Sequence, residues 1–298
     1  GLATAQDRER ELIEAMRDEA PRVEFPIALE TAYFRLNERE SFVPIAAKLP
    51  WSALEWATKR GKREAEFDFA TEVRDQQSNK IVGALRDTIK VSLATDHFQQ
   101  LQQHALLYQG GLILGPGNYR LKFLARENET GRIGSFEQDL LIPKLDAGKI
   151  ELSSVLLSSQ IERVSDTSGV KRKSLGTDPR LKVTVLEVSG ERIVPSVTHV
   201  FTNRQELYVF FQAYLPAGVD GSKTQAGLAF YRNGEYVSET PLVGPAETDA
   251  KKQTASFRIG LPLDKLPPGS YTVQAVVVQD GGEQAGFARS YFAVRPAP

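Results

Sequence analysis

The chain has 298 residues, 41% hydrophobic and 25% charged, which is the composition of a folded protein and not of a disordered chain. Its 37 Lys and Arg residues nearly balance its 38 Asp and Glu residues, which argues against nucleic acid and anionic membrane surfaces as partners. The absence of cysteine excludes disulfides, thiolate metal sites and a cysteine nucleophile, and without an apolar run of about 18 residues we expect no membrane insertion.

Residues 5–20 predict the one clear helix of the chain. Asp7 is placed to cap its first turn, and further acidic residues follow, as expected near the positive end of a helix dipole. Leu12, Ile13 and Met16 form a narrow apolar stripe. We therefore expect the helix to dock through these three residues on the side of a larger body.

After residue 21 the sequence changes to the pattern of β-strands. Phe67 and Phe69, for example, alternate with Glu66 and Asp68, so that one side of the strand is apolar. We expect strands at residues 24–35, 40–49, 66–73, 81–93, 105–114, 119–126 and 133–142, with short helices over 52–59 and 96–104. Seven short strands separated by turns are typical of an antiparallel β-sandwich of the immunoglobulin or fibronectin type III class.

The second half of the chain predicts another all-β domain. Its expected strands are residues 181–188, 197–201, 207–215, 225–231, 236–241, 255–259, 271–279 and 285–294, and a further strand over 150–161 precedes it. Asn233 followed by Gly234 is the strongest hairpin indication in the chain. The predicted organisation is an N-terminal helix and connector over 1–21, a sandwich over 22–145, a linker with a strand and a polar loop over 146–180, and a second sandwich over 181–298.

Two short motifs recur at a constant distance, which indicates that the two domains are copies. The matched residues are Pro116 with Pro268, Gly117 with Gly269, Tyr119 with Tyr271 and Gly134 with Gly286, each 152 residues apart, and Phe136 with Phe287 after a slip of one residue. A Pro-Gly-x-Tyr element at the start of a late strand is typical of a tyrosine corner, in which the hydroxyl group bonds to nearby backbone.

Several segments resemble one bacterial family. They are residues 7–10, 26–30, 33–34, 42–44, 121–131, 152–160 and 194–201. They resemble the β-rich C-terminal region of the von Willebrand factor A-related domain proteins of Acidobacteria, over nearly the whole chain. The resemblance implies a secreted or cell-envelope setting and an A domain upstream. The Asp-x-Ser-x-Ser metal signature of that A domain is absent, and residues 166–170 depart from it at the fifth position.

The sequence contains only incomplete catalytic and cofactor motifs. Residues 115–120 lack the third glycine of a dinucleotide-binding loop, and residues 218–224 lack the spacing of a phosphate-binding loop. His97, His104 and His199 are scattered without a carboxylate at metal-ligand spacing. We therefore expect no catalytic residue, cofactor or metal centre. A hydrolase that uses carboxylates, such as those at residues 64, 66 and 68, stays open as an alternative.

Three aromatic residues are the candidates for a binding surface. Trp51 and Trp56 flank a short loop or helix, and Tyr108 precedes two glycines. Exposed rings on a sandwich could stack on sugars, whereas buried rings would pack a short helix over the end of the sandwich. Packing of the rings at the end of the sandwich is the favoured interpretation. Whether the rings are exposed or buried distinguishes it from a sugar-binding platform.

The sequence therefore predicts a non-catalytic protein-interaction or spacer module of an exported bacterial cell-envelope protein, not an enzyme. Its expected partner is an envelope protein or the upstream A domain, because strands set a distance while loops and edges stay free to bind. A carbohydrate-binding accessory module is the alternative, with a glycan as partner. Since the chain begins with Gly1 and not Met, we expect a processed product or a part of a longer protein.

Overall fold

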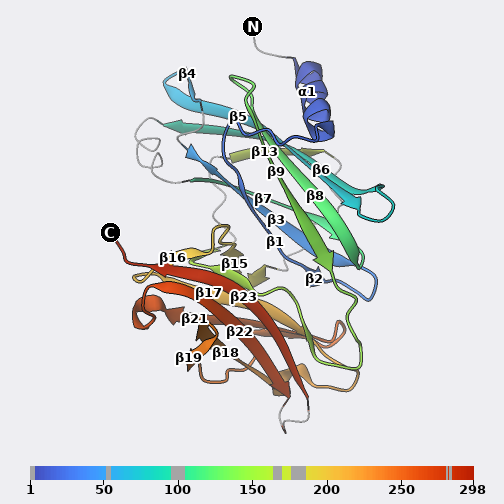
Figure 1. Ribbon diagram of the computed structural model, residues 1–298, viewed down its shortest axis with the longest axis vertical. Helices are drawn as coiled ribbons and strands as arrows, with labels where there is room; N and C mark the ends of the chain where they lie inside the picture. The colour runs from blue at the N-terminus through green and yellow to red at the C-terminus, as the bar shows by residue number, and fades with distance from the viewer. Residues whose placement is uncertain are drawn as a thin grey trace. The chain divides into compact units, whose positions relative to one another are not determined.

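The computed structural model describes residues 4–51, 55–94, 105–163, 170–175, 186–279, 281 and 284–298. Apart from helix α1 (Ala5–Arg17) and short 3-10 turns, the regular elements of these residues are β-strands (Figure 1). Neighbouring strands pair antiparallel, as β5 (Lys62–Asp75) does with β8 (Gly117–Glu127), whereas β16 (Val200–Thr202) pairs parallel with β23 (Ala285–Arg295). The all-β class with one short N-terminal helix is confirmed. None of the described helices is long and apolar enough to cross a membrane.

The chain folds into two compact units whose segments are interleaved in the sequence. Unit 1 consists of Gly1–Thr31, Phe42–Pro143 and Thr167–Lys182, and unit 2 of Ala32–Ser41, Lys144–Asp166 and Val183–Pro298. Each unit thus includes a segment from the other half of the chain. This organisation differs from the linear division at residues 22–145 and 181–298, which assigns residues 32–41 to the first domain.

Unit 1 is a sandwich of two sheets. The larger has the order β13–β6–β5–β8–β9, with β4 also on β5; in the smaller, β3 pairs with β1 and with β7. The strands are β1 (Ala28–Thr31), β3 (Ser41–Pro50), β4 (Ala57–Lys59), β5 (Lys62–Asp75), β6 (Ile81–Ala94), β7 (Ala105–Leu114), β8 (Gly117–Glu127), β9 (Ile133–Ile142) and β13 (Val170–Leu175). The Tyr108 ring of β7 stacks on Phe69 at 4.3 Å and lies 5.4 Å from Phe123, so aromatic contacts join the two sheets.

Unit 2 is a second sandwich with a third, small sheet. One large sheet has the order β10–β17–β21–β20, with β11 also on β17, and the other has the order β16–β23–β22–β18–β19. The strands are β10 (Glu151–Leu152), β11 (Leu156–Ser158), β16 (Val200–Thr202), β17 (Glu206–Tyr214), β18 (Thr224–Arg232), β19 (Glu235–Glu239), β20 (Glu247–Asp249), β21 (Thr254–Pro262), β22 (Gly269–Gln279) and β23 (Ala285–Arg295). The small sheet contains β12 (Gln160–Arg163), β14 (Glu187–Val188) and β15 (Glu191–Val194). The order of the two large sheets is that of an immunoglobulin-like sandwich.

The β8–β9 hairpin of unit 1 and the β22–β23 hairpin of unit 2 pair in the same register. They correspond to the hairpin of strands F and G in an immunoglobulin domain. The equivalent cross-strand pairs are Tyr119–Leu140 and Tyr271–Phe292, and Ala125–Gly134 and Val277–Gly286, each 152 residues apart. The repeat is therefore confirmed. The one-residue slip predicted between Phe136 and Phe287 is wrong, because Ser135 and not Phe136 occupies the position of Phe287. A slip of one residue would turn each later side chain to the other side of the strand.

Both predicted tyrosine corners are present. The Tyr119 hydroxyl donates a hydrogen bond to the Gly115 carbonyl oxygen at 2.8 Å, and the Tyr271 hydroxyl donates to the Pro267 carbonyl oxygen at 2.5 Å. Both rings are buried, Tyr119 near the start of β8 and Tyr271 near the start of β22. They satisfy a turn carbonyl group that the sheet does not pair, which fixes where the hairpin begins.

Helix α1 docks as expected, with two corrections. Thr4 and not Asp7 is its N-cap, because Asp7 is the third residue of a capping box whose side chain bonds back to the Thr4 backbone. The buried residues of the helix are Leu12, Ala15 and Met16, whereas Ile13 is 37% exposed. Positions 12, 15 and 16 share one helix face, while position 13 lies about 100° around the axis.

Other expected elements differ from those observed. Residues 57–59 are strand β4 and not part of a helix over 52–59, because Arg60 and Gly61 adopt positive φ and turn the chain into β5. Residues 170–175, expected in a polar loop, form β13 and pair with β6. Residues 150–161 are divided among β10, β11 and β12. The helix expected over 96–104 lies outside the described residues.

The segment Ala32–Ser41 packs on β17 of unit 2. Phe34 is fully buried, and its ring lies 5.6 Å from that of Phe210. The Arg35 guanidinium stands 4.4 Å from the centroid of the Tyr214 ring, and the Arg35 backbone N–H donates to the Tyr214 hydroxyl oxygen at 2.7 Å. This segment therefore shields the side of β17 that faces away from the sandwich core.

Substitution of Leu12 tests the docking of α1. Leu12→Ala is expected to lower the free energy of unfolding of unit 1 by about 2 kcal/mol or more, because it leaves a cavity under the helix. The matched variant Ile13→Ala is expected to change it by less than about 0.5 kcal/mol. Both tryptophans belong to unit 1, so urea unfolding followed by tryptophan fluorescence measures this unit. Equal effects of the two substitutions would contradict the docking.

Substitution of Phe34 tests the interleaved organisation. Phe34→Ala is expected to destabilise unit 2 by about 3 kcal/mol, because it empties the contact with Phe210. The transition followed by circular dichroism is expected to move to lower urea for unit 2, and the tryptophan-monitored transition of unit 1 is expected to move less. A shift of the tryptophan transition alone would instead support the linear division of the chain.

Candidate functional site

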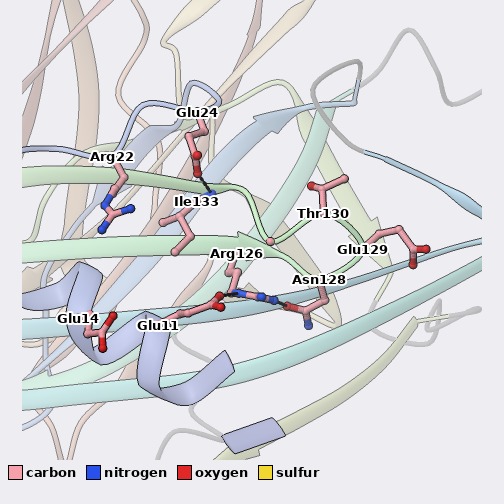
Figure 2. Close-up of a pocket in the computed structure, with 10 residues that line it drawn as sticks. Glu11, Glu14, Arg22, Glu24, Arg126, Asn128, Glu129, Thr130 and Ile133 are labelled. Carbon is pink, nitrogen blue, oxygen red and sulfur yellow. Dashed lines mark hydrogen bonds and ion pairs between the residues drawn. The ribbon is translucent and has the colours of Figure 1, made fainter. Parts of the chain in front are cut away.

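A closed chain of polar contacts fastens α1 to the large sheet of unit 1. The Arg8 guanidinium donates to the Glu66 carboxylate, which also accepts from the Asn128 amide at 3.2 Å. The Asn128 amide oxygen accepts from Arg126 at 2.6 Å, and Arg126 Nε donates to Glu11 at 2.7 Å (Figure 2). Arg8 and Glu11 are three residues apart on α1, so the chain of contacts begins and ends on one helix face.

Basic groups of β8 lie beneath the helix. Arg126 is 2% exposed, and its charge is compensated by Glu11. The Lys122 ammonium donates to the Asp18 carbonyl oxygen, just beyond the end of α1, at 2.5 Å and pairs with Glu137 at 3.3 Å. A buried charge without a partner is strongly unfavourable, so these contacts hold the helix and the sheet together as one structure.

The Arg8–Glu66 pair is the titratable centre of this network. Burial raises the pKa of the Glu66 carboxyl, but the hydrogen bonds and charges of Arg8 and the amide of Asn128 outweigh burial, so this pKa lies below its ordinary value. Burial lowers the pKa of Arg8, yet Glu66 and Asp68 bring it above its ordinary value. Both groups are therefore charged at neutral pH.

A hollow of about 590 Å³ lies beside this network (Figure 2). It is lined by Glu11, Glu14, Arg22, Glu24, Arg126, Asn128, Glu129, Thr130, Gly131 and Ile133. Several of its charged groups are used within the protein: Glu24 accepts from the Ile133 N–H at 2.5 Å, and Arg22 pairs with Asp18 at 2.6 Å. The arrangement attaches a helix to a sheet and contains no base placed against a nucleophile.

The described residues contain no group of three or more His, Asp or Glu side chains that could hold a metal ion. His97 and His104 lie outside those residues. The His199 ring nitrogen Nδ1 is 2.7 Å from the Tyr291 carbonyl oxygen, which is a local contact between β23 and the turn before β16.

The three rings proposed as a binding surface lie within unit 1. Trp51 is 7% exposed and Tyr108 is 1% exposed, and the Trp51 and Trp56 rings lie 4.5 Å apart. The Tyr108 hydroxyl donates to the Asp87 carboxylate. The alternative of an exposed sugar-binding platform is therefore wrong for Trp51 and Tyr108, because both rings are buried. Trp56 is half-buried against Trp51.

An exposed surface of another kind lies on the β19–β18–β22–β23 part of unit 2. Phe287 is 60% exposed and Tyr291 is 66% exposed on β23, and Tyr236 of β19 is 57% exposed, with its ring 6.1 Å from that of Tyr231. We call this surface the aromatic face. It consists of Tyr231, Tyr236, Thr272, Gln274, Val276, Phe287, Arg289 and Tyr291. The residues between them in sequence, such as Val273, point into the core.

Among the eight residues that define the aromatic face, Arg289 is the charged one; Glu239 of β19, which pairs with Ala229, stands at the edge of the same side. Its Nε donates to the Gln274 amide oxygen at 2.8 Å, across the pairing of β22 with β23. A hollow of about 630 Å³ lies against Gln274, Phe287 and Arg289. The face thus combines exposed rings with a central guanidinium group, and it can bind an apolar partner that brings one acceptor.

Sequence reasoning missed the aromatic face because both sides of β23 are apolar. Phe287 and Tyr291 alternate with Phe292 and Val294, so the period-two pattern does not tell which set is inside. A usable indication was the repeat itself. At the position of Phe287 the first copy has Ser135, a residue that is rarely placed in a core.

Comparison with known proteins gives little beyond this. No family model matches the chain, and no curated protein matches it. Among solved structures, Bacteroides uniformis beta-glucuronidase matches 39% of this chain and 13% of its own, with 11% identity and a TM-score of 0.28. The chicken interferon gamma receptor alpha chain matches 91% of this chain and 99% of its own, with 11% identity and a TM-score of 0.22. Fibronectin(III)-like modules of CbhA from Clostridium thermocellum match 91% and 94%, with 10% identity and a TM-score of 0.20. Likenesses this loose carry no inference about function.

Acid is expected to loosen α1. The folded-state pKa of Glu66 is depressed, so its ion pair stabilises docking above its ordinary pKa of 4.5 and is lost as the pH falls through the folded value. The amide protection of α1, corrected for intrinsic exchange rates, should fall below about pH 4.5. In Glu66→Gln, protection should already be lower at pH 7 and change less with acid. Protection of α1 that is independent of pH in both proteins would contradict this.

Proposed function

We propose that this chain is a non-catalytic protein-interaction or spacer module of an exported bacterial cell-envelope protein. The observation that carries the proposal is the aromatic face of unit 2. Phe287, Tyr291 and Tyr236 are each more than half exposed, on strands that pair in regular register. Contiguous exposed apolar surface on a folded protein usually marks a binding site, and aromatic residues with arginine are enriched at protein interfaces.

The non-catalytic part of the proposal rests on how the carboxylates are used. Glu66 and Asp68, candidates for a hydrolase pair, both lie against Arg8, and Asp68 also accepts from the Thr88 hydroxyl at 2.7 Å. Glu64 pairs with Lys90 at 3.4 Å. These groups hold strands and α1 in place. A general acid needs a raised pKa, and the pKa of Glu66 is shifted the other way.

The bacterial envelope setting rests on the resemblance to the C-terminal region of von Willebrand factor A-related proteins. In that setting the partner is an envelope protein or the A domain itself. The interleaved segments of the two units support the spacer part of the proposal, because each unit is tied to the other half of the chain. Such a chain is expected to resist separation into independent halves.

Photo-crosslinking tests the proposal. A benzoylphenylalanine placed at Tyr291 is expected to capture a discrete envelope protein, because this position lies in the aromatic face. The matched position is Leu141, which is 63% exposed on β9 of unit 1 and lies outside that face. The expected result is a protein adduct at position 291 and none at 141.

A glycan array run on the same chain gives the contrary outcome. The proposal would be overturned by no protein adduct at position 291 together with specific glycan binding that Phe287→Ala and Tyr291→Ala abolish. That result would identify a carbohydrate-binding module whose platform is the aromatic face and not Trp51, Trp56 and Tyr108.

A further inference from the structure

The aromatic face has a counterpart of the same strand pairing in unit 1. Residues of β22 and β23 correspond to residues 152 positions earlier on β8 and β9. Ala229 faces Gln274 just as Glu72 faces Lys122, so β18 corresponds to β5 at a distance of 157 residues. The same three-strand surface therefore occurs twice, and each position on one copy can be compared with a known position on the other.

In unit 1 this surface is covered by an amphipathic helix. Leu12, Ala15 and Met16 of α1 form one buried cluster with residues of the three strands. Those strand residues are Ala70, Leu124 and Ile133, and their counterparts in unit 2 are Gly227, Val276 and Ala285. The positions that receive the helix are thus small or aliphatic in both units.

The chemistry around those positions is opposite in the two units. The outward positions of unit 1 carry eight charges, on Asp68, Glu72, Arg74, Arg120, Lys122, Arg126, Glu137 and Asp139. Their counterparts are Gln225, Ala229, Tyr231, Thr272, Gln274, Val278, Arg289 and Tyr291, of which only Arg289 is charged. The charged positions of unit 1, among them those that hold α1, are thus occupied in unit 2 by Arg289, three uncharged polar side chains and four apolar or aromatic ones.

From this comparison we infer that the aromatic face receives an amphipathic α-helix of a partner protein. The helix presents a broad apolar stripe to Phe287, Tyr291 and Val276, and one carboxylate to Arg289. This inference rests on the proposed function and names the chemistry of the partner. In unit 1 the guanidinium of Arg126 on the corresponding surface takes the Glu11 carboxylate of α1, although Arg126 stands at the position of Val278 and Glu137 at that of Arg289.

The dimensions of the face fit a helix of the length of α1. Thirteen residues of α-helix extend over about 20 Å. The outward residues of β23 from Ala285 to Tyr291 extend over about 20 Å of strand. Leu242 stands over Gly227, where a Cβ atom would meet its Cδ2 atom at 3.1 Å, and thus borders the face beside β18.

The position of Arg289 favours such a helix over a second copy of the chain. Arg289 lies between Phe287 and Tyr291 on β23, near the middle of the aromatic face. A two-fold pairing of two such faces about their centres would place two guanidinium groups against each other in an apolar setting. Like charges that are desolvated together repel strongly, whereas a helix can place a carboxylate there.

Peptide selection tests the inference. A phage-displayed library of randomised peptides, built on a helical scaffold as long as α1, is panned against the whole chain. Enriched peptides are expected to carry apolar residues at i, i+3, i+4 and i+7 and an acidic residue. Their affinity, measured by titration, is expected to fall about tenfold or more in Phe287→Ser and to be unchanged in Leu141→Ser.

Charge reversal gives the sharper measurement. Arg289→Glu is expected to lower the affinity of the chain for an enriched acidic peptide about tenfold. Replacement of the acidic residue of that peptide by Lys is expected to restore binding to the Arg289→Glu variant. Because Phe287 and Arg289 point outward, circular dichroism of the variants should match that of the parent chain.

Four outcomes would overturn the inference. They are an empty selection, enriched peptides without helical spacing, binding that ignores Arg289→Glu, and a dimer of the chain that Phe287→Ser dissociates. If a protein is crosslinked at position 291 while the selected peptides are extended, the inference fails and the proposed function stands. If glycans bind at the face and no protein does, both fail.

Discussion

The shared register of the β8–β9 and β22–β23 hairpins is the constraint on which both units depend. Each begins at a tyrosine corner, where Tyr119 or Tyr271 bonds to a turn carbonyl group. Once that pairing is set, the alternation of the strand decides which side chains enter the core and which face outward. The same outward positions therefore recur in both sandwiches. What differs between the units is the chemistry placed on those positions and what covers it.

The outward surface of β5, β8 and β9 in unit 1 and that of β18, β22 and β23 in unit 2 differ in their chemistry. In unit 1 the surface is charged, and α1 adds complementary charges, so that Arg126 can be buried at 2% exposure beside Glu11. A surface of this kind gives specificity of docking more than stability, since the desolvation of each charge offsets much of its attraction. In unit 2 the desolvation of Phe287 and Tyr291 would itself drive association, and Arg289 would set its direction.

Local patterns were enough to predict the sandwiches, the Pro-Gly-x-Tyr corners and the turn at Asn233 and Gly234, where both residues adopt positive φ. Elements that depend on distant pairing were not predictable in this way. Strand β13 forms because β6 offers an edge about 80 residues earlier, and Phe34 is buried by Phe210. The candidate site failed for a related reason. Alternation shows that a strand has two kinds of side without telling which one faces water, so the buried Tyr108 and the exposed Tyr291 look alike in the sequence.

The residues that the two copies share and those in which they differ therefore carry different information. Gly134 and Gly286 recur because a Cβ atom there would meet another stretch of chain, at 2.7 Å from Phe25 and 2.6 Å from the Ile150 carbonyl oxygen. Such shared residues point inward or into a turn and maintain the fold. Other inward positions differ between the copies but mostly stay apolar, as at Leu121 and Val273, whereas outward positions change in chemistry, as where Ser135 becomes Phe287. Because the outward side chains do not pack in the sandwich core, the change from Ser135 to Phe287 is best explained by contact with a partner outside the unit.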